Sequence, residues 1–256
     1  MKSLFKSMLL LVLLTGVSCH TDERSVNQIE NAAVSQNLML EKSVATGNPY
    51  DYLGVLHNEF MQEMHNSKPS DDSEIPTLAL KFANSNGFNT SAYDYSRVSA
   101  IKDESMNSEF TRQKIDELTS RFQFSQNYKE ELYKLADFFN AANYDSTDDI
   151  INQLQRIENS YIEATNLTQI EKENLLATIA ITRHSTNYWI SFFPDDFNSG
   201  NNGAILAKRR WWARIFGGIV ADAMGAVIGT IGGPAGMIVG AAAASAGVQF
   251  VVDDNM

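Results

Sequence analysis

The chain has 256 residues, of which 31 are acidic and 20 are basic, so its formal net charge is −11. A chain this acidic is not expected to bind nucleic acid through its overall charge. Hydrophobic residues make up 44% of the sequence and only five residues are prolines, which is typical of a folded protein. Cys19 is the only cysteine, and this excludes an internal disulfide framework, a multi-cysteine zinc site and an iron–sulfur cluster.

Residues 1–18 have the layout of an export signal. Lys2 and Lys6 form a basic start, Met8 to Leu14 form a short apolar run, and small residues lead up to Cys19. The apolar run is shorter than the roughly 20 residues of a permanent membrane helix. We therefore expect the signal to be removed after export.

The sequence TGVSC at this point resembles the cleavage site of a bacterial lipoprotein signal, in a loose form found in Bacteroidetes-type lipoproteins, with Gly16 where leucine is usual. The resemblance implies that Cys19 becomes the first residue and is lipidated. Residues 19–24 would then be a tether, and the protein would lie at the outer membrane or cell surface, attached to membrane lipid. An ordinary secretory signal, which would leave a periplasmic or secreted protein, is the alternative.

Residues 25–195 carry helix signals and little strand alternation. Apolar residues recur at three- and four-residue steps in the segments 115–124, 128–142 and 150–164. Helix starts are also marked, because Ser146 precedes Asp149, and Thr168 precedes Glu171, at the spacing of a capping box. The fold class predicted for this domain is all-α.

The most distinctive local sequence, NPYDYLGVLHNEFMQ, runs from Asn48 to Gln62. Asn48 can cap a turn, Pro49 suits the start of a helix, and apolar residues at helical spacing follow. The stretch resembles an NPYDYxGxxHN sequence near the start of uncharacterised Bacteroidetes-type exported lipoproteins, some of which end in a bacteriocin-like glycine zipper. That resemblance brings no known activity with it.

Residues 196–210 are predicted to be a linker, and residues 211–252 a glycine-rich hydrophobic helical hairpin. The C-terminal region holds nine of the fifteen glycines, and Asp222 is the only charge between Arg214 and Asp253. The sequence GGP, from Gly232 to Pro234, interrupts the run, because proline disfavours a helical residue before it. The predicted arms are Arg214–Ile231 and Ala235–Val252.

The hairpin glycines recur at four-residue steps, which leaves a groove without side chains along one helix face. This small-xxx-small pattern favours close helix association and resembles a glycine zipper. We expect it to form a homo-oligomer or to bind a partner helix. The predicted groove residues are Gly225, Gly229, Gly232, Gly233, Gly236, Gly240 and Ala244.

Cations and tryptophans lie around the start of the predicted hairpin, as is typical of a membrane headgroup boundary. The predicted membrane-interface residues are Lys208, Arg209, Arg210, Trp211, Trp212 and Arg214. Base stacking on nucleic acid is the less favoured use of this cluster. The alternative for the hairpin as a whole is the buried core of a helical domain, with Trp211, Trp212 and Phe216 packed inside.

Catalytic, cofactor and metal motifs are absent from the sequence. His57 and His65 are eight residues apart, which is wrong for two ligands of one ion on a helix. His57 is expected in the core, His65 on the surface and His184 on a helix near Tyr188. The first hypothesis is a non-enzymatic cell-envelope lipoprotein without a metal or cofactor. A colicin-like membrane-inserting effector is the alternative, and an enzyme with a scattered site, holding His57 or His184 in a polar pocket, is a weaker one.

Overall fold

The computed structural model describes residues 47–141, 146–192 and 204–253, with the side chains of 204–214, 231 and 251–253 excepted. The predicted signal, Cys19 and the tether lie outside these residues. All regular elements in the described ranges are helices, so the all-α prediction is confirmed. They are α3 (Asp51–Ser67), η2 (Asp72–Glu74), α4 (Ile75–Ser85), α5 (Tyr95–Met106), α6 (Arg112–Phe122), α7 (Gln126–Ala141), α8 (Thr147–Glu163), α9 (Gln169–Phe192), α10 (Ala204–Gly229), η3 (Thr230–Gly232) and α11 (Gly233–Asp253).

Polar side chains begin several of these helices. The Ser146 hydroxyl accepts a hydrogen bond from the Asp149 backbone N–H, at 3.1 Å, at the start of α8. At the start of α9 the exchange is reciprocal: Thr168 Oγ1 accepts from the Glu171 N–H, and the Glu171 carboxylate accepts from the Thr168 N–H. Both predicted capping sequences are therefore confirmed, because each satisfies backbone donors that the first helical turn leaves free.

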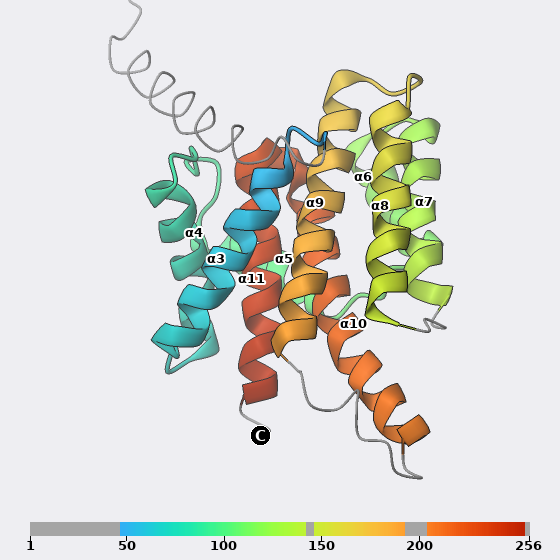
Figure 1. The fold of residues 1–256 in the computed structure, drawn as a ribbon. Coiled ribbons are helices and arrows are strands. Elements are labelled where there is room, and N and C mark those ends of the chain that lie inside the picture. The colour runs from blue at the N-terminus through green and yellow to red at the C-terminus, as the bar shows by residue number, and fades with distance from the viewer. Residues whose placement is uncertain (1–46, 142–145, 193–203, 254–256) are drawn as a thin grey trace, which may run out of the picture.

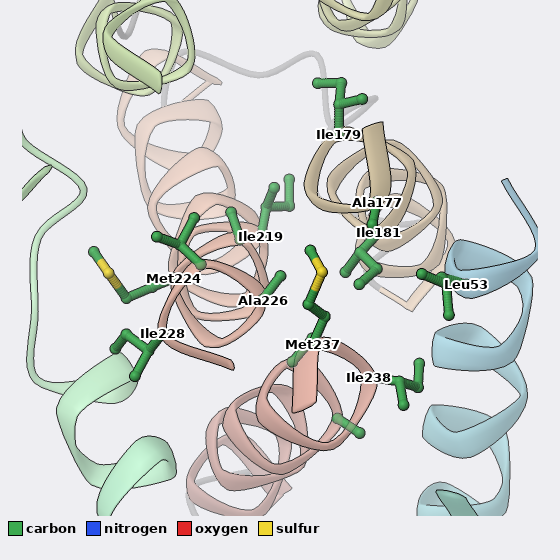
Figure 2. Packing of buried hydrophobic residues seen from close by; sticks show 14 of the residues in the cluster. Leu53, Ala177, Ile179, Ile181, Ile219, Met224, Ala226, Ile228, Met237 and Ile238 are labelled. Atoms are coloured by element: carbon green, nitrogen blue, oxygen red, sulfur yellow. The ribbon is translucent and has the colours of Figure 1, made fainter. Parts of the chain in front are cut away.

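Helix α11 lies in the middle of the molecule, as Figure 1 shows. It packs against α3, α4, α5, α9 and α10, while α6, α7 and α8 form a group beside α9 and α10. Side chains close the spaces between these helices. In Figure 2, Ile238 of α11 lies beside Leu53 of α3, and Met237 lies beside Ala177 and Ile181 of α9. One hydrophobic core thus contains residues of the hairpin and of the helices before it.

The hairpin differs in its limits from the predicted arms. Helix α10 begins at Ala204, inside the stretch 196–210 that the sequence predicts as a linker. The turn is a short 3₁₀ segment, and α11 begins directly at Gly233, whose φ is +61°. Pro234 fits the first turn of α11 because that position needs no N–H donor.

Within the residues that the structure describes, no helix combines the length and apolar character needed to cross a membrane.

Candidate functional site

Helices α10 and α11 meet along four glycines, here called the glycine seam: Gly225, Gly229, Gly236 and Gly240. A Cβ atom on Gly225 would lie 2.4 Å from the Gly240 carbonyl oxygen, and one on Gly229 would lie 2.1 Å from the Gly236 carbonyl oxygen. Real side chains never approach a backbone this closely. The helices therefore touch backbone to backbone, and the groove faces within the hairpin.

The other predicted groove residues have different surroundings. A Cβ on Gly232 would lie 1.6 Å from the Tyr93 hydroxyl, which also donates a hydrogen bond to the Gly229 carbonyl. Gly233 has no neighbour within 4 Å of a built Cβ, and its positive φ makes it the turn residue. Ala244 is fully buried. The glycines of the predicted groove thus lie in the seam, against Tyr93 or in the turn, and Gly236 meets both the seam and Tyr93.

The NPYDYxGxxHN stretch meets α8 and α9 through Asn48, which lies just before α3, and through Asp51 and Gly54 in the first turn of α3. Asp51, Gly54 and His57 are spaced three residues apart, so neighbouring members lie on adjacent parts of the helix surface. Gly54 lets the helices approach, because a Cβ there would lie 2.5 Å from the Ala180 carbonyl oxygen and 2.3 Å from the His184 ring. This stretch therefore acts as the packing surface for α9.

Five buried or half-buried polar residues around this contact form what we call the polar seam: Asn48, Asp51, Glu158, Arg183 and His184. The Arg183 guanidinium donates to the Asp51 carboxylate and, at 3.2 Å, to the Glu158 carboxylate. Asn48 donates to Glu158 at 2.7 Å and to the Leu176 carbonyl at 2.9 Å. His184 Nε2 lies 2.9 Å from Asp51 Oδ1. Three helices, α3, α8 and α9, are joined by these contacts.

The electrostatics of the polar seam depend on the Arg183 guanidinium between two carboxylates and on His184 beside Asp51. Burial alone would raise the pKa of Asp51, but the hydrogen bond and charge of His184, together with Arg183, hold that pKa below its ordinary value. Arg183, Glu158 and Asp51 are all less than a tenth exposed. Their charges must therefore compensate one another, since water cannot do so.

A second buried group, the Asp222 cluster, contains His57, Ser185, Trp189 and Asp222. All four are fully buried. Ser185 and Trp189, both on α9, donate to Asp222 Oδ2, the indole N–H at 3.1 Å. His57 Nε2 of α3 faces the same oxygen at 3.5 Å. The only charged residue between Arg214 and Asp253 thus connects the hairpin to α3 and α9.

One ring nitrogen of His57 has a hydrogen-bond partner and the other has none. Asn58 Nδ2 donates to the His184 carbonyl, so Asn58 Oδ1 is free to accept from His57 Nδ1, at 3.1 Å. His57 Nε2 lies 3.5 Å from Asp222 Oδ2 and makes no hydrogen bond. The two fully buried side chains bring α3 and α10 into contact within the core.

Serine, histidine and aspartate occur together in the Asp222 cluster, but not as an activated nucleophile. The Ser185 hydroxyl donates to Asp222 instead of to His57, and solvent reaches none of the three. Three cavities of about 250, 280 and 350 Å³ lie elsewhere, and neither His57 nor His184 lines them. In the part of the chain that the structure describes, no group of three or more His, Cys, Asp or Glu residues could hold a metal ion.

The positions of the histidines and of the predicted membrane-interface residues can be compared with those expected from the sequence. His57 lies in the core and His184 lies one turn before Tyr188, as expected. His65 was expected on the surface; it is partly exposed, packs against Phe192, and its Nδ1 lies 3.2 Å from Gln249 Nε2. The six predicted membrane-interface residues belong to the first turns of α10, where their side chains are outside the described part.

Glu158, Arg183 and Ser185 were not singled out from the sequence. Arg183 has a weak signal, since it interrupts an otherwise apolar and hydroxyl-bearing stretch of α9. The three-residue spacing of Asn48, Asp51 and Gly54 is a stronger signal for a polar face. Asp222 is also visible in the sequence as the only charged residue between Arg214 and Asp253.

In comparisons with known proteins, no family model, no curated protein and no solved structure matches this chain.

Proposed function

We propose that this chain is a non-enzymatic cell-envelope protein, exported through residues 1–18 and attached to membrane lipid through Cys19. Its hairpin α10–α11 is stored within the fold and associates with a partner helix or a membrane surface when it is released. The observation that carries the proposal is the hairpin itself: a glycine-packed helix pair, with Asp222 as its only charged residue between Arg214 and Asp253, in the centre of a strongly acidic protein.

A few polar contacts hold the hairpin in place, and this supports its release as a unit. Asp222 contacts α3 and α9, Tyr93, just before α5, donates to the Gly229 carbonyl at 3.2 Å, and Gln249 accepts from Tyr188 at 3.1 Å. Most of the remaining contact is apolar burial, which is non-directional and can be replaced by another apolar surface. The glycine seam stays closed within the hairpin during such an exchange.

A disulfide between α5 and α11 tests whether release is required. A Cβ on Gly247 would lie 2.3 Å from Met106 Sδ, so Met106→Cys with Gly247→Cys places two thiols close together. In a Cys19→Ala background, the oxidised protein should lose association with liposomes or a partner, and reduction should restore it. Equal association in both redox states would contradict the proposal, and each single-cysteine variant is the control for the substitutions themselves.

Lipid attachment needs its own experiment. Cells that express wild type or Cys19→Ala, each with and without residues 204–256, should be fractionated and their membranes extracted with carbonate. The intact mass of each mature chain should then be measured. A lipid-sized mass that disappears with Cys19, together with membrane retention of the truncated chain, is the expected result. Carbonate resistance of Cys19→Ala that depends on residues 204–256 would instead make the hairpin the anchor.

A colicin-like membrane-inserting effector is the second candidate. The observation that favours it is the arrangement of an apolar hairpin inside a layer of more polar helices, among them α3, α5 and α9. This candidate requires dye leakage from liposomes by the reduced Met106→Cys/Gly247→Cys protein and none by its oxidised form. Binding without leakage would favour the first proposal. A scattered-site enzyme is the weakest candidate, because the described cavities hold neither His57 nor His184.

A further inference from the structure

Helix α10 extends past the end of its partner α11. In the glycine seam Gly225 of α10 meets Gly240 of α11, and the two helices of the hairpin run in opposite directions. Counted from this contact, Asp253, where α11 ends, lies level with Trp212. Residues 204–211, here called the α10 arm, lie beyond that level. At 1.5 Å for each helical residue, they extend about 12 Å past α11.

Helix α9 also ends before the arm. Ser185 of α9 donates to Asp222. One turn further along α9, Trp189 lies against Gly218, because a Cβ on Gly218 would lie 2.1 Å from the Trp189 ring. The two helices therefore run in opposite directions. Since α9 ends three residues after Trp189, its end lies near the level of Ile215.

Helix α7 gives the same result. The ring of Phe139 lies 6.3 Å from that of Phe216, and α7 ends two residues later, at Ala141. In Figure 1 the first turns of α10 project from the lower right of the molecule, away from the other labelled helices. The α10 arm therefore extends beyond the helices that pack against the rest of α10.

The sequence of the arm and its base has a local excess of positive charge. Between Asp196 and Asp222 there are four basic residues and no acidic one. The basic residues are Lys208, Arg209, Arg210 and Arg214. Because the whole chain carries −11, the residues outside this cluster carry −15. Consecutive positions of an α-helix are about 100° apart, so positions 208, 209 and 210 are distributed around the helix axis.

The length of the arm decides which of these charges a nearby surface meets. At physiological ionic strength, charges in water are screened over roughly 8 Å, which is less than the length of the arm. The negative charge of the helices behind the arm is therefore largely screened at its tip. An anionic surface that approaches the tip is attracted to the arm even though the protein as a whole is acidic.

Apolar residues accompany the basic ones. The arm begins with the sequence AILA, from Ala204 to Ala207, and Trp211 and Trp212 follow the basic residues. Tryptophans and cations together are typical of the lipid headgroup region, where indole rings lie beside lipid and cations meet phosphate. An acidic protein surface or a nucleic acid backbone would match the charge but would offer no apolar surface to Ile205 and Leu206. A lipid surface offers both.

We propose that the α10 arm binds the phosphate headgroups of anionic lipids at a membrane surface. This inference rests on the membrane location proposed above, and it names the lipid that the chain recognises. It does not require release of the hairpin, because the arm already lies beyond the helices that pack against the rest of α10.

Sedimentation with lipid vesicles measures this preference. The full chain in a Cys19→Ala background is mixed with vesicles of phosphatidylcholine alone, or of phosphatidylcholine and phosphatidylglycerol in equal parts. Binding to the anionic vesicles should be at least about tenfold tighter. This anionic excess should fall as salt is added, because salt screens exposed charges.

The disulfide variant separates this inference from the proposed release of the hairpin. Oxidised Met106→Cys/Gly247→Cys protein should lose binding to uncharged vesicles but keep its anionic excess. Loss of the anionic excess on oxidation would overturn the inference, since the arm would then act only after release. Unchanged binding to uncharged vesicles on oxidation would contradict the release alone.

Neutralised variants assign the anionic excess to the arm. Lys208→Gln/Arg209→Gln/Arg210→Gln should weaken binding to anionic vesicles by on the order of a hundredfold, at roughly fivefold for each cation near an anionic surface. Binding to uncharged vesicles should change much less. Circular dichroism of the variant establishes that it is folded.

A matched control removes the same charge from the body of the protein. Lys68, Lys81 and Arg156 are all exposed, and they lie outside the arm. Lys68→Gln/Lys81→Gln/Arg156→Gln should therefore keep most of the anionic excess. An equal loss in the two triple variants would mean that binding follows net charge and not the arm, and would overturn the proposal.

Three further results would overturn it. Equal binding of the folded wild type to both kinds of vesicle would exclude anionic headgroups as the ligand. A single-stranded oligonucleotide that binds more tightly than anionic vesicles would assign the arm to nucleic acid. Self-association at low salt that the arm variant abolishes, without an anionic excess, would assign the arm to the acidic surface of a second copy.

Discussion

The glycine seam and the polar seam join helices by opposite means. Between α10 and α11, side chains are missing, so that Gly225 and Gly229 lie directly on backbone carbonyls of α11. Between α3, α8 and α9, buried side chains from distant segments meet, with Arg183 between Asp51 and Glu158. Both contacts are buried, and both bring helices close together.

The two contacts are therefore destabilised by different kinds of substitution. The glycine seam contains no group that needs a partner, so only an added side chain can disturb it. The polar seam contains charges that compensate one another, so the loss of any member leaves another unpaired. The first contact can move as a unit, whereas the second fixes which helices meet.

Removal of Arg183 should have the largest effect on stability. Arg183→Met keeps much of the volume but leaves the Asp51 and Glu158 carboxylates buried without their shared cation, at a cost of about 3–5 kcal/mol. Urea denaturation measures this loss. Adding Asp51→Asn and Glu158→Gln to the same variant should restore much of it, because no buried charge then remains. A triple variant as unstable as Arg183→Met would mean that Arg183 acts through its shape and not its charge.

Adding a side chain to the glycine seam should have the second-largest effect on stability. In Gly229→Ala the new methyl group would lie 2.1 Å from the Gly236 carbonyl oxygen, so the helices must separate, at a cost of about 1–3 kcal/mol. Gly217→Ala is the matched control on the same helix, because nothing lies within 4 Å of its built Cβ. The control should gain up to about 1 kcal/mol from helix propensity. Similar thermal shifts in both variants would contradict the backbone contact.

The polar seam should also be acid-sensitive, with a smaller effect. The folded-state pKa of Asp51 lies below the ordinary 3.8, so the ionised carboxylate contributes stability that is present above pH 3.8 and is lost as the pH falls through the folded value. Asp51→Asn cannot lose this contribution. The stability difference between wild type and Asp51→Asn should therefore shrink below about pH 4. A constant difference from pH 7 to pH 3 would contradict this role.

The smallest expected effect on stability belongs to the hydrogen bond between Tyr93 and the glycine seam. Tyr93→Phe removes the hydrogen bond to the Gly229 carbonyl but keeps the ring, and should cost about 1 kcal/mol. Tyr95→Phe is the control, because Tyr95 is 46% exposed. An equal change in thermal stability for the two variants would mean that the Tyr93 hydroxyl does not help to hold the hairpin turn.

Much of the helical structure could be predicted from local sequence. Ser146 and Thr168 cap helices where predicted, and the buried face of α7 follows from the spacing of Leu132, Leu135 and Phe139. The start of α10 at Ala204 was missed, because glycine and asparagine just before it suggested a longer linker. Among candidate site residues, the lone Asp222 was visible in the sequence, but its partners were not.

The sequence by itself determined the helical periods, the caps and the rows of glycines, because these depend on residues a few positions apart. Only the tertiary structure decided what each row and each charge would meet. Asn48 and Glu158 are 110 positions apart, and Asp51 and Arg183 are 132 apart. No local pattern encodes such a pairing, since it follows from how complete helix faces pack around α11.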